Sequence, residues 1–229
     1  MKLRGIQQLL HIGYLKTLWF NFRYLSFKQA LMIPVILARD VSVRECSRGG
    51  VFFDSEKPLH PGILRIGFGD SIHNPYQKSS ILIRGKLIIH GTGLHAFCMG
   101  TKLNIEKNGI LEIGDNFSAS ANNKIRCDCH IKIGDDNMWS YDNILLDTDA
   151  HQITDNDGNL LNHPKPIEFG NHVWLGCGCI VLKGSKIPNG CIVASGSKIM
   201  HQYEEENCII TTGKKIIKRD IMWNRNISV

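Results

Sequence analysis

The sequence lacks any apolar stretch long enough to cross a bilayer, and this absence sets the first limit on what the protein is. In its 229 residues, the longest charge-free apolar stretch near the N-terminus, Gln29 to Ala38, has ten residues and contains Pro34. A spanning helix needs about 20. The start of the chain also lacks the apolar segment and small-residue cleavage site of a signal peptide. We therefore expect a cytoplasmic protein with reduced thiols.

The chain has little net charge outside its N-terminal segment. The formal net charge is +6, and residues 1–48 carry eight Lys and Arg against two acids, which accounts for all of it. The remaining residues are neutral overall and contain no basic run with interleaved aromatics. A neutral body argues against a broad nucleic-acid-binding face, so we expect no nucleic acid as a partner.

The eight cysteines lack the paired spacing of common zinc sites. Cys127, Cys129 and His130 lie together, but one residue separates the two thiols where zinc knuckles have two. No second pair follows at a suitable distance. We predict no bound metal, and we interpret Cys179 and Cys191 as small core residues.

A six-residue repeat dominates the second half of the chain. From residue 169 onward every first position of the repeat is large and apolar, and every fifth position is small or β-branched. The first positions are Phe169, Leu175, Val181, Ile187, Val193 and Ile199, and the fifth positions are Val173, Cys179, Ser185, Cys191 and Ser197. A period of six fits neither a helix nor an alternating strand. It predicts an all-β solenoid, a parallel β-helix of about seven triangular coils with the first positions inside.

Two segments interrupt this pattern. Residues 150–166 place histidine and aspartate where apolar residues would be needed and are rich in turn residues, so we expect them to loop out. The N-terminal segment has an amphipathic helix pattern. The residues on its apolar face are Ile6, Leu9, Leu10, Tyr14 and Leu18. The expected organisation is a basic, aromatic-rich helical cap over 1–48, a β-helix domain over 49–205 and a basic tail over 206–229.

The repeat and the segments around the excursion resemble the left-handed β-helix (hexapeptide-repeat) acyltransferases, in particular the sugar O-acetyltransferases of capsule and lipopolysaccharide biosynthesis. The segments that carry the resemblance are Asp147–His151, Lys165–Gly176, Ile180–Gly184 and the tail Gly213–Trp223. The resemblance implies left-handed coils, acetyl-CoA as the acetyl donor and a sugar hydroxyl as the acceptor. It also implies a homotrimer with active sites between subunits.

The resemblance implies the site residues as well. His151 aligns with the catalytic histidine of the family, and histidine suits general-base catalysis because its ordinary pKa, about 6.5, lies near working pH. Asp149 is placed to accept from the other ring nitrogen and fix its tautomer. The residues implied for acetyl-CoA are Trp174, Gly176, Cys177, Gly178, Ala194, Ser195, Lys198, Lys214, Lys215, Lys218 and Arg219. Those expected to bind the acceptor are Trp139, Tyr141, Asp142 and Asn143.

Several alternatives stay open from the sequence. One alternative keeps the fold and changes the acceptor to the amino group of a nucleotide-linked amino sugar or to serine. Serine acetyltransferases, however, carry a larger helical N-terminal domain than this chain supplies. A metal hydratase like the γ-class carbonic anhydrases would need three histidines, and His90 and His95 have the spacing of one pair. A binding or structural β-helix without catalysis is the alternative of another class. The N-terminal segment either caps the open end of the solenoid or, through residues 1–28, contacts the inner membrane face.

Overall fold

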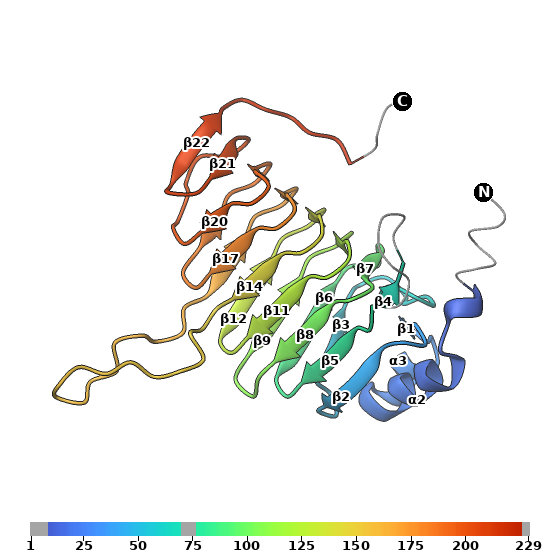
Figure 1. Cartoon of the computed structure of the whole chain (residues 1–229). Coiled ribbons are helices and arrows are strands. Elements are labelled where there is room, and N and C mark those ends of the chain that lie inside the picture. Colours follow the sequence, from blue (N-terminus) through green and yellow to red (C-terminus); the bar gives the residue numbers. More distant parts are fainter. Residues whose placement is uncertain (1–8, 70–76, 226–229) are drawn as a thin grey trace.

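The computed structural model describes residues 9–69 and 77–225, which form a parallel β-helix (Figure 1). In this part of the chain the strands assemble into three sheets of nine, seven and six strands, here called sheets 1, 2 and 3. The chain passes from sheet 1 to sheet 2 to sheet 3 and returns to sheet 1, so each circuit is one coil. Described neighbouring strands are parallel except the last pair, which is antiparallel. The predicted all-β solenoid is confirmed, and seven strands in sheet 2 agree with the expected number of coils.

The strands are short, as the repeat requires. Sheet 1 contains β1 (Val35–Leu37), β4 (Leu64–Phe68), β7 (His95–Cys98), β10 (Ser118–Ala119), β13 (Met138–Trp139), β16 (Trp174–Leu175), β19 (Ile192–Val193), β21 (Ile209–Thr211) and β22 (Lys215–Lys218). Sheet 2 contains β2 (Ser42–Cys46), β5 (Ser80–Ile83), β8 (Lys102–Ile105), β11 (Lys124–Cys127), β14 (Ile144–Leu146), β17 (Ile180–Leu182) and β20 (Lys198–Ile199). Sheet 3 contains β3 (Val51–Asp54), β6 (Lys86–His90), β9 (Ile110–Ile113), β12 (His130–Ile133), β15 (Ile167–Phe169) and β18 (Lys186–Ile187).

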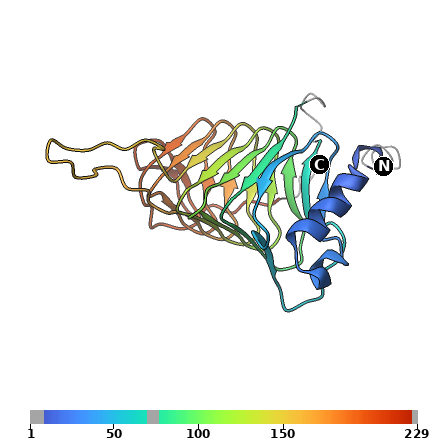
Figure 2. The ribbon, with the colours of Figure 1, turned by 90° about the horizontal axis from the view of Figure 1, so that it is seen from below.

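Three edges separate the sheets, and each is named for the sheets that it joins. The chain turns from sheet 1 to sheet 2 at edge 1–2, from sheet 2 to sheet 3 at edge 2–3, and back to sheet 1 at edge 3–1. Figure 2 shows the coils stacked in one direction, with α2 (Tyr14–Tyr24) at the end where the chain begins. The excursion projects sideways from the stack.

The core is a set of inward columns, as the repeat predicts. All the first and fifth positions from Phe169 to Ile199 are buried, which confirms Cys179 and Cys191 as core residues. An aromatic column runs through Phe97, Phe117, Trp139 and Phe169, whose successive ring centroids lie 5.0 to 5.1 Å apart. All eight cysteines lie in the described part and are free thiols. Burial of these apolar side chains is the main stabilising contribution to the fold.

Helix α2 caps the open end of sheet 1 with polar side chains. Asn21 donates to the Val35 carbonyl at 2.7 Å and accepts from the Val35 amide at 3.2 Å. The Thr17 hydroxyl accepts from the Leu37 amide at 3.0 Å. These bonds pair backbone groups at the free edge of β1, which would otherwise be open to pairing with another chain.

The apolar face expected from the sequence points outward. Leu9, Leu10, Tyr14 and Leu18 are 42% to 64% exposed, and Ile6 lies outside the described residues. The short helix α3 (Phe27–Ala30) follows α2. The described residues include no helix that is both long enough and apolar enough to span a membrane.

The structure moves both expected domain boundaries. Strand β1 pairs with β4, and β2 with β5, so the β-helix begins at Val35 and not after residue 48. Strand β21 still belongs to sheet 1, so the β-helix continues past residue 205. The sequence pattern missed these coils because their strands do not follow the hexapeptide spacing. The excursion is confirmed between β14 and β15, as a protruding loop with a bridge between Thr154 and Leu160.

Candidate functional site

The excursion leaves the solenoid at edge 2–3, directly after β14. Residues 147–166 connect β14 to β15, and His151 is exposed near the start of this segment. Ala150 has a φ of 63°, in the left-handed region, and its amide donates to the Thr148 hydroxyl at 3.1 Å. This turn directs the chain away from the coil, so His151 stands at the root of the loop.

The Asp149 carboxylate fastens the two arms of the excursion. It accepts from the Lys183 ammonium and, at 2.9 Å, from the Asn162 side-chain amide. Asn162 also donates to the His151 carbonyl at 2.7 Å. The hydrogen bond from Lys183 is the largest of the effects that lower the pKa of Asp149, so the carboxylate is stabilised in its ionised form. Sequence reasoning missed both partners, although Lys183 lies within the motif Ile180–Gly184.

The imidazole of His151 is exposed, and no hydrogen bond within the described ranges involves either ring nitrogen. Asp149, which was expected to orient the ring, binds Lys183 and Asn162 instead. The catalytic role of His151 and the orienting role of Asp149 therefore stay predictions. The geometry offers an imidazole that can both donate to and accept from a ligand, at the root of a fastened loop.

Asp147 lies two residues before Asp149 but faces the inside of edge 2–3. It is fully buried, and its two oxygens accept from the backbone amides of Asp128 and Cys129, each at 2.8 Å. Desolvation is the largest effect on this carboxyl and raises its pKa. Asp147 thus shapes the corner and does not face the root of the loop.

Two of the four residues expected to bind the acceptor lie inside the solenoid. Trp139 is 1% exposed and packs between Phe117 and Phe169. Asn143 is fully buried, and its side-chain oxygen accepts from the Cys179 amide at 2.8 Å. The prediction that these two residues contact the acceptor is wrong, because each occupies an inward position of its coil.

Tyr141 and Asp142 face outward at edge 1–2. Asp142 is exposed, with a φ of 62°. A hydrogen bond with the Cys177 thiol is the largest of the effects that raise the pKa of the Tyr141 phenol. The Tyr141 carbonyl accepts from the Gly178 amide at 3.0 Å. Edge 1–2 therefore brings the remaining acceptor candidates beside two cofactor candidates, Cys177 and Gly178.

Six of the residues implied for acetyl-CoA form one row along sheet 1 and edge 1–2. They are Trp174, Gly176, Cys177, Gly178, Ala194 and Ser195. The amides of Gly176 and Cys177 already donate within the protein, at 2.9 and 3.3 Å, so they are not spare donors for a ligand. A Cβ at Gly178 or Gly196 would meet nothing within 4 Å. The outer side of the row is therefore an open strip that a narrow chain can approach.

The basic candidates gather at the C-terminal end of the stack. Lys214, Lys215 and Lys218 are exposed at the hairpin of β21 and β22. Arg219 forms an ion pair with Glu205 at 2.7 Å, which partly neutralises the guanidinium charge. Lys198 is exposed on β20. Their part in binding phosphates stays a prediction.

Beyond the hairpin, residues 219–225 return across edge 3–1 as a strap. The Trp223 ring stacks on His172 with centroids 4.0 Å apart, and it lies 6.0 Å from the Trp174 ring. The Trp223 indole donates to the His172 carbonyl at 3.0 Å. One flank of the cofactor row is therefore lined by the tail, which no sequence pattern indicated.

Arg225 anchors the far end of the strap. Its guanidinium donates to Asp136 at 3.0 Å and to the Ser118 hydroxyl at 2.6 Å. A further bond reaches the Asn116 carbonyl at 3.0 Å. The strap therefore ties the end of the chain to coils in the middle of the solenoid.

The structure separates the histidine pair of the metal-hydratase alternative. His95 is fully buried, and its ring nitrogens lie 2.9 and 2.8 Å from the carbonyls of Gly93 and Gly114. Burial is the largest effect on this imidazole and lowers its pKa. His90 instead lies 3.0 Å from Asp54 at the outer surface. Within residues 9–69 and 77–225, no group of three or more His, Cys, Asp or Glu is arranged to hold a metal.

Comparison with known proteins gives the hand of the coils. No family model matches the sequence. A polysialic acid O-acetyltransferase of Neisseria meningitidis is 42% identical over 55 residues, which are 24% of this chain and only about a quarter (26%) of that protein. The solved polysialic-acid-specific acetyltransferase NeuO matches with a TM-score of 0.55 and 22% identity, over 84% of this chain and 91% of that one. The polysialic acid O-acetyltransferase OatWY matches with a TM-score of 0.51 and 23% identity, over 82% and 90%. The chain has their left-handed β-helix fold.

Proposed function

We propose that the protein is an acetyltransferase that moves an acetyl group from acetyl-CoA to a sugar hydroxyl. The observation that carries the proposal is the exposed His151 imidazole at the root of an excursion fastened by Asp149, Lys183 and Asn162. The shared fold with two polysialic acid O-acetyltransferases and the short match to a third support it. The acceptor by this reasoning is a polysaccharide or a precursor of one.

In the proposed step His151 acts as a general base. One ring nitrogen takes the proton of the acceptor hydroxyl as its oxygen attacks the thioester carbon. The oxygen–carbon bond forms, the carbon–sulfur bond breaks, and the imidazolium returns the proton to the leaving thiolate. The acetyl group passes directly from sulfur to the acceptor oxygen, so the step needs no covalent enzyme intermediate. Asp149, bound by Lys183 and Asn162, holds the root of the loop from which His151 projects.

Acetyl-CoA fits the open strip along edge 1–2. Its narrow arm would run beside Trp174, Cys177 and Ser195, where glycines leave the surface open. The lysines of the last hairpin would face its phosphates. Because the amides in this row donate internally, recognition of the arm would depend on side chains and on carbonyl oxygens.

A homotrimer would complete this site. Within one chain, His151 lies at edge 2–3 and the cofactor row at edge 1–2, at opposite ends of the strands of sheet 2. A neighbouring copy that packs against one of these edges would bring the two halves together. The outer face of sheet 2 is apolar near His151, with Ile144, Leu146 and Leu182 half-buried in the monomer. Such a face gains stability when a second copy covers it.

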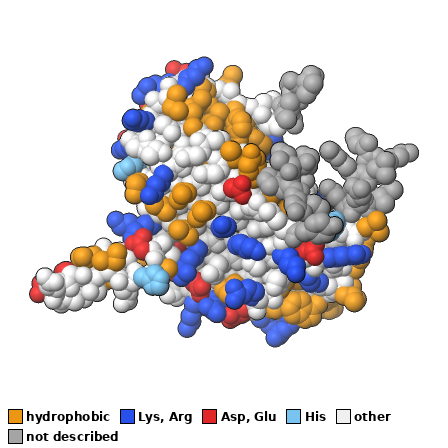
Figure 3. Space-filling model, in the orientation of Figure 1, with side chains coloured by type: hydrophobic (Ala, Val, Ile, Leu, Met, Phe, Trp, Pro, Cys, Tyr) orange, Lys and Arg blue, Asp and Glu red, His pale blue; other side chains and the backbone are white. Residues whose placement is uncertain are grey.

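The N-terminal segment would place the enzyme on the cytoplasmic face of a membrane. Leu15 and Phe27 are 84% and 72% exposed, and Trp19 and Phe22 about half exposed. Figure 3 shows hydrophobic and basic side chains together over α2 and α3. Thr17, Phe20, Asn21 and Tyr24 form the buried side of α2, so the exposed apolar side chains remain available to lipid. The positive charge of this segment is complementary to anionic headgroups.

Vesicle sedimentation tests the membrane proposal. We expect binding to vesicles with anionic lipid, and about tenfold weaker binding for Leu15→Ser combined with Phe27→Ser. Met200→Ser, an exposed apolar residue at the other end of the stack, is the matched control and should bind normally. Equal sedimentation of all three proteins would leave the segment only its capping role.

An acetylation assay tests the enzyme proposal. The full chain is incubated with acetyl-CoA and a panel of sialic acid oligomers, neutral oligosaccharides, an amino sugar nucleotide and serine, and thiol release and product mass are measured. We expect turnover with a sugar hydroxyl. Turnover only with the amino sugar or serine would replace the O-acetylation proposal. No turnover and no binding of acetyl-CoA by calorimetry would point to a non-catalytic β-helix.

A further inference from the structure

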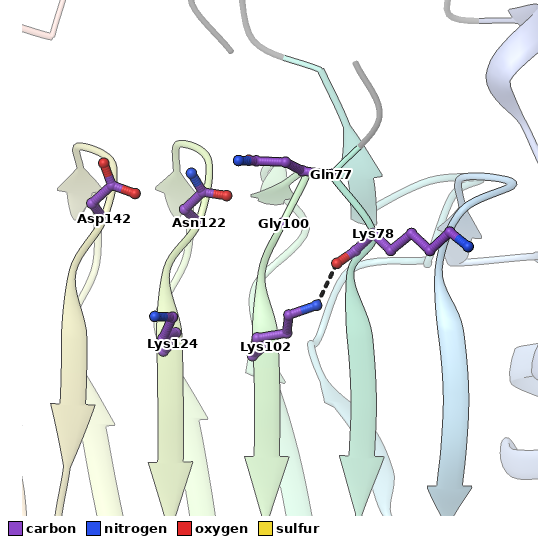
Figure 4. A pocket seen from close by; sticks show the side chains of 7 residues that line it. All are labelled: Gln77, Lys78, Gly100, Lys102, Asn122, Lys124 and Asp142. Carbon is purple, nitrogen blue, oxygen red and sulfur yellow. Dashed lines mark hydrogen bonds between the residues drawn. The ribbon is translucent and has the colours of Figure 1, made fainter. Parts of the chain in front are cut away.

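A cavity of about 400 Å³ lies on edge 1–2, in the coils that lead up to His151. Figure 4 shows the ammonium groups of Lys78, Lys102 and Lys124, which line it, directed away from one another. A ligand there would meet these charges singly, so the cavity does not define what it would bind. The polar side chains at the root of the excursion converge instead on one short stretch of backbone.

Asn162, on the returning arm of the excursion, bonds to three alternate residues of the outgoing arm. Its side-chain nitrogen donates to the Asp149 carboxylate at 2.9 Å and to the His151 carbonyl at 2.7 Å. Its side-chain oxygen accepts from the Ile153 amide at 2.8 Å. One side chain thus holds the outgoing arm at His151 itself and on both sides of it.

The three partners require an amide at this position. Two of them are acceptors and the third is a donor, so the nitrogen of Asn162 must face Asp149 and His151, and its oxygen must face Ile153. A carboxylate donates no hydrogen bond, so it would place a further oxygen against the first two partners. An apolar side chain would satisfy none of the three. The contacts around His151 therefore account for the residue type at position 162.

Lys183 connects this set of bonds to the solenoid. It follows β17 directly, in the next coil at edge 2–3. Its ammonium donates to the Asp149 carboxylate and, at 3.3 Å, to the His163 carbonyl. The Lys183 side chain is 21% exposed, which limits competition from water for these bonds. A continuous path of hydrogen bonds therefore runs from the solenoid through Asp149 and Asn162 to the backbone of His151.

The backbone is what fixes the imidazole in place. In the described part of the chain no hydrogen bond involves either ring nitrogen of His151, so the position of the ring depends on the loop that carries it. A general base must lie within hydrogen-bond distance of the proton that it takes. A displacement of about 1 Å can lower a rate by about 10²-fold. A base on an exposed loop thus needs a hold on the loop itself.

We propose that Asn162 is a positioning residue, which holds the backbone of Asp149, His151 and Ile153 so that the imidazole projects toward the acceptor hydroxyl. This inference rests on the proposed function for the role of His151, whereas the hold on the backbone can be measured without turnover. Asn162 acts through His151 and contacts neither the acceptor nor the donor.

Hydrogen exchange tests the hold on the backbone. We expect Asn162→Ala to speed exchange of the Ile153 amide about tenfold, because that amide loses its acceptor. Asn162→Asp keeps an acceptor oxygen and should leave the same amide protected. Asn159→Ala is the matched control, since Asn159 lies at the tip of the same excursion and its side chain bonds to Asp155 at 2.9 Å. Exchange at Ile153 should be native in this control.

Acetyl-transfer kinetics test the effect on His151. Asn162→Ala and Asn162→Asp both release the His151 carbonyl, so both should lower kcat by about 10²-fold and leave the KM for acetyl-CoA unchanged. Asn159→Ala should keep the native kcat. The midpoint of urea unfolding should move little in all three variants, because both asparagines lie in the excursion, outside the core.

Native exchange at Ile153 in Asn162→Ala, or a native kcat in that variant, would overturn the inference. An equal loss of kcat in Asn159→Ala would do the same, and so would a raised KM for acetyl-CoA at native kcat, which would assign Asn162 to the donor. If the native chain transfers acetyl groups to no acceptor, the proposed function fails. Faster exchange in Asn162→Ala would then still show that Asn162 holds the backbone around His151.

Discussion

The stretch from residue 139 to residue 151 contributes side chains to two regions of the molecule, the interior of the solenoid and its outer edges. Trp139, Asn143 and Asp147 point inward and are buried, whereas Asp149 and His151 are exposed. The residue types are similar on both sides, but their surroundings are opposite. Burial raises the pKa of Asp147, while the bond from Lys183 lowers that of Asp149. Inward residues should therefore govern stability and outward residues chemistry.

His151→Ala should give the largest effect, and it should fall on activity alone. Loss of a general base lowers the rate by about 10² to 10⁴-fold. The exposed ring makes no described hydrogen bond, so the midpoint of denaturant unfolding should not move. Acetyl-transfer kinetics and urea unfolding on the same preparation check both halves. A loss of stability without a loss of activity would show that His151 has a structural role, like the inward residues.

Trp139→Ala should show the reverse pattern, with a loss of about 3–5 kcal/mol in the free energy of unfolding. The cavity would interrupt the column between Phe117 and Phe169. Trp139→Phe is the control, because it keeps a ring and removes an indole N–H that has no partner in the described part. It should cost much less. A selective loss of acceptor affinity in Trp139→Ala, with native stability, would restore its predicted binding role.

Asp147→Asn should destabilise the chain by about 1–3 kcal/mol, because one of the two buried backbone amides would face an N–H in place of an oxygen. The matched change at the outer surface, Asp149→Asn, should lower the unfolding midpoint much less, because its ion pair with Lys183 is exposed to solvent. It should instead reduce turnover by loosening the root of the loop. If both variants unfold alike, the division between the inner and outer carboxylates does not hold.

The pH dependence of stability should separate the same two carboxylates most finely. The folded pKa of Asp147 is raised, so the native chain should lose unfolding free energy as pH rises from about 4 through that pKa. Asp147→Asn should lack this fall. The folded pKa of Asp149 is lowered, so its stabilisation is present above about pH 4 and is lost as pH falls through that pKa. Urea unfolding between acidic and neutral pH measures both slopes, and identical slopes in the two variants would contradict the assignment.

The sequence predicts the coils well because their periodicity reflects a local rule. Each hexapeptide places one apolar side chain inward, so Phe169 to Ile199 could be assigned position by position. The excursion was visible for the same reason, since its polar residues break that rule. The same rule places Trp139 in the core, so the prediction that its ring binds the acceptor conflicts with its position in the coil.

Other features depend on contacts that no local pattern encodes. The sequence shows that the N-terminal segment has an apolar helix face but not which side meets the solenoid, because the contacts of Asn21 and Thr17 with the backbone of β1 follow no local pattern. Lys183 reaches Asp149 across 34 residues of chain. Such partners can only be assigned once the coils are stacked.

The strap has a consequence for how the solenoid comes apart. A stack of coils in which each contacts only its neighbours unravels from its ends, one unit at a time. Arg225 is bound to Asp136 and Ser118, and Trp223 lies on His172, so the last coils cannot peel away singly while these contacts hold. The tail thus links the last coils of the stack to coils in its middle. Its C-terminal half should open as one cooperative unit, which keeps the proposed cofactor row intact until the whole unit is lost.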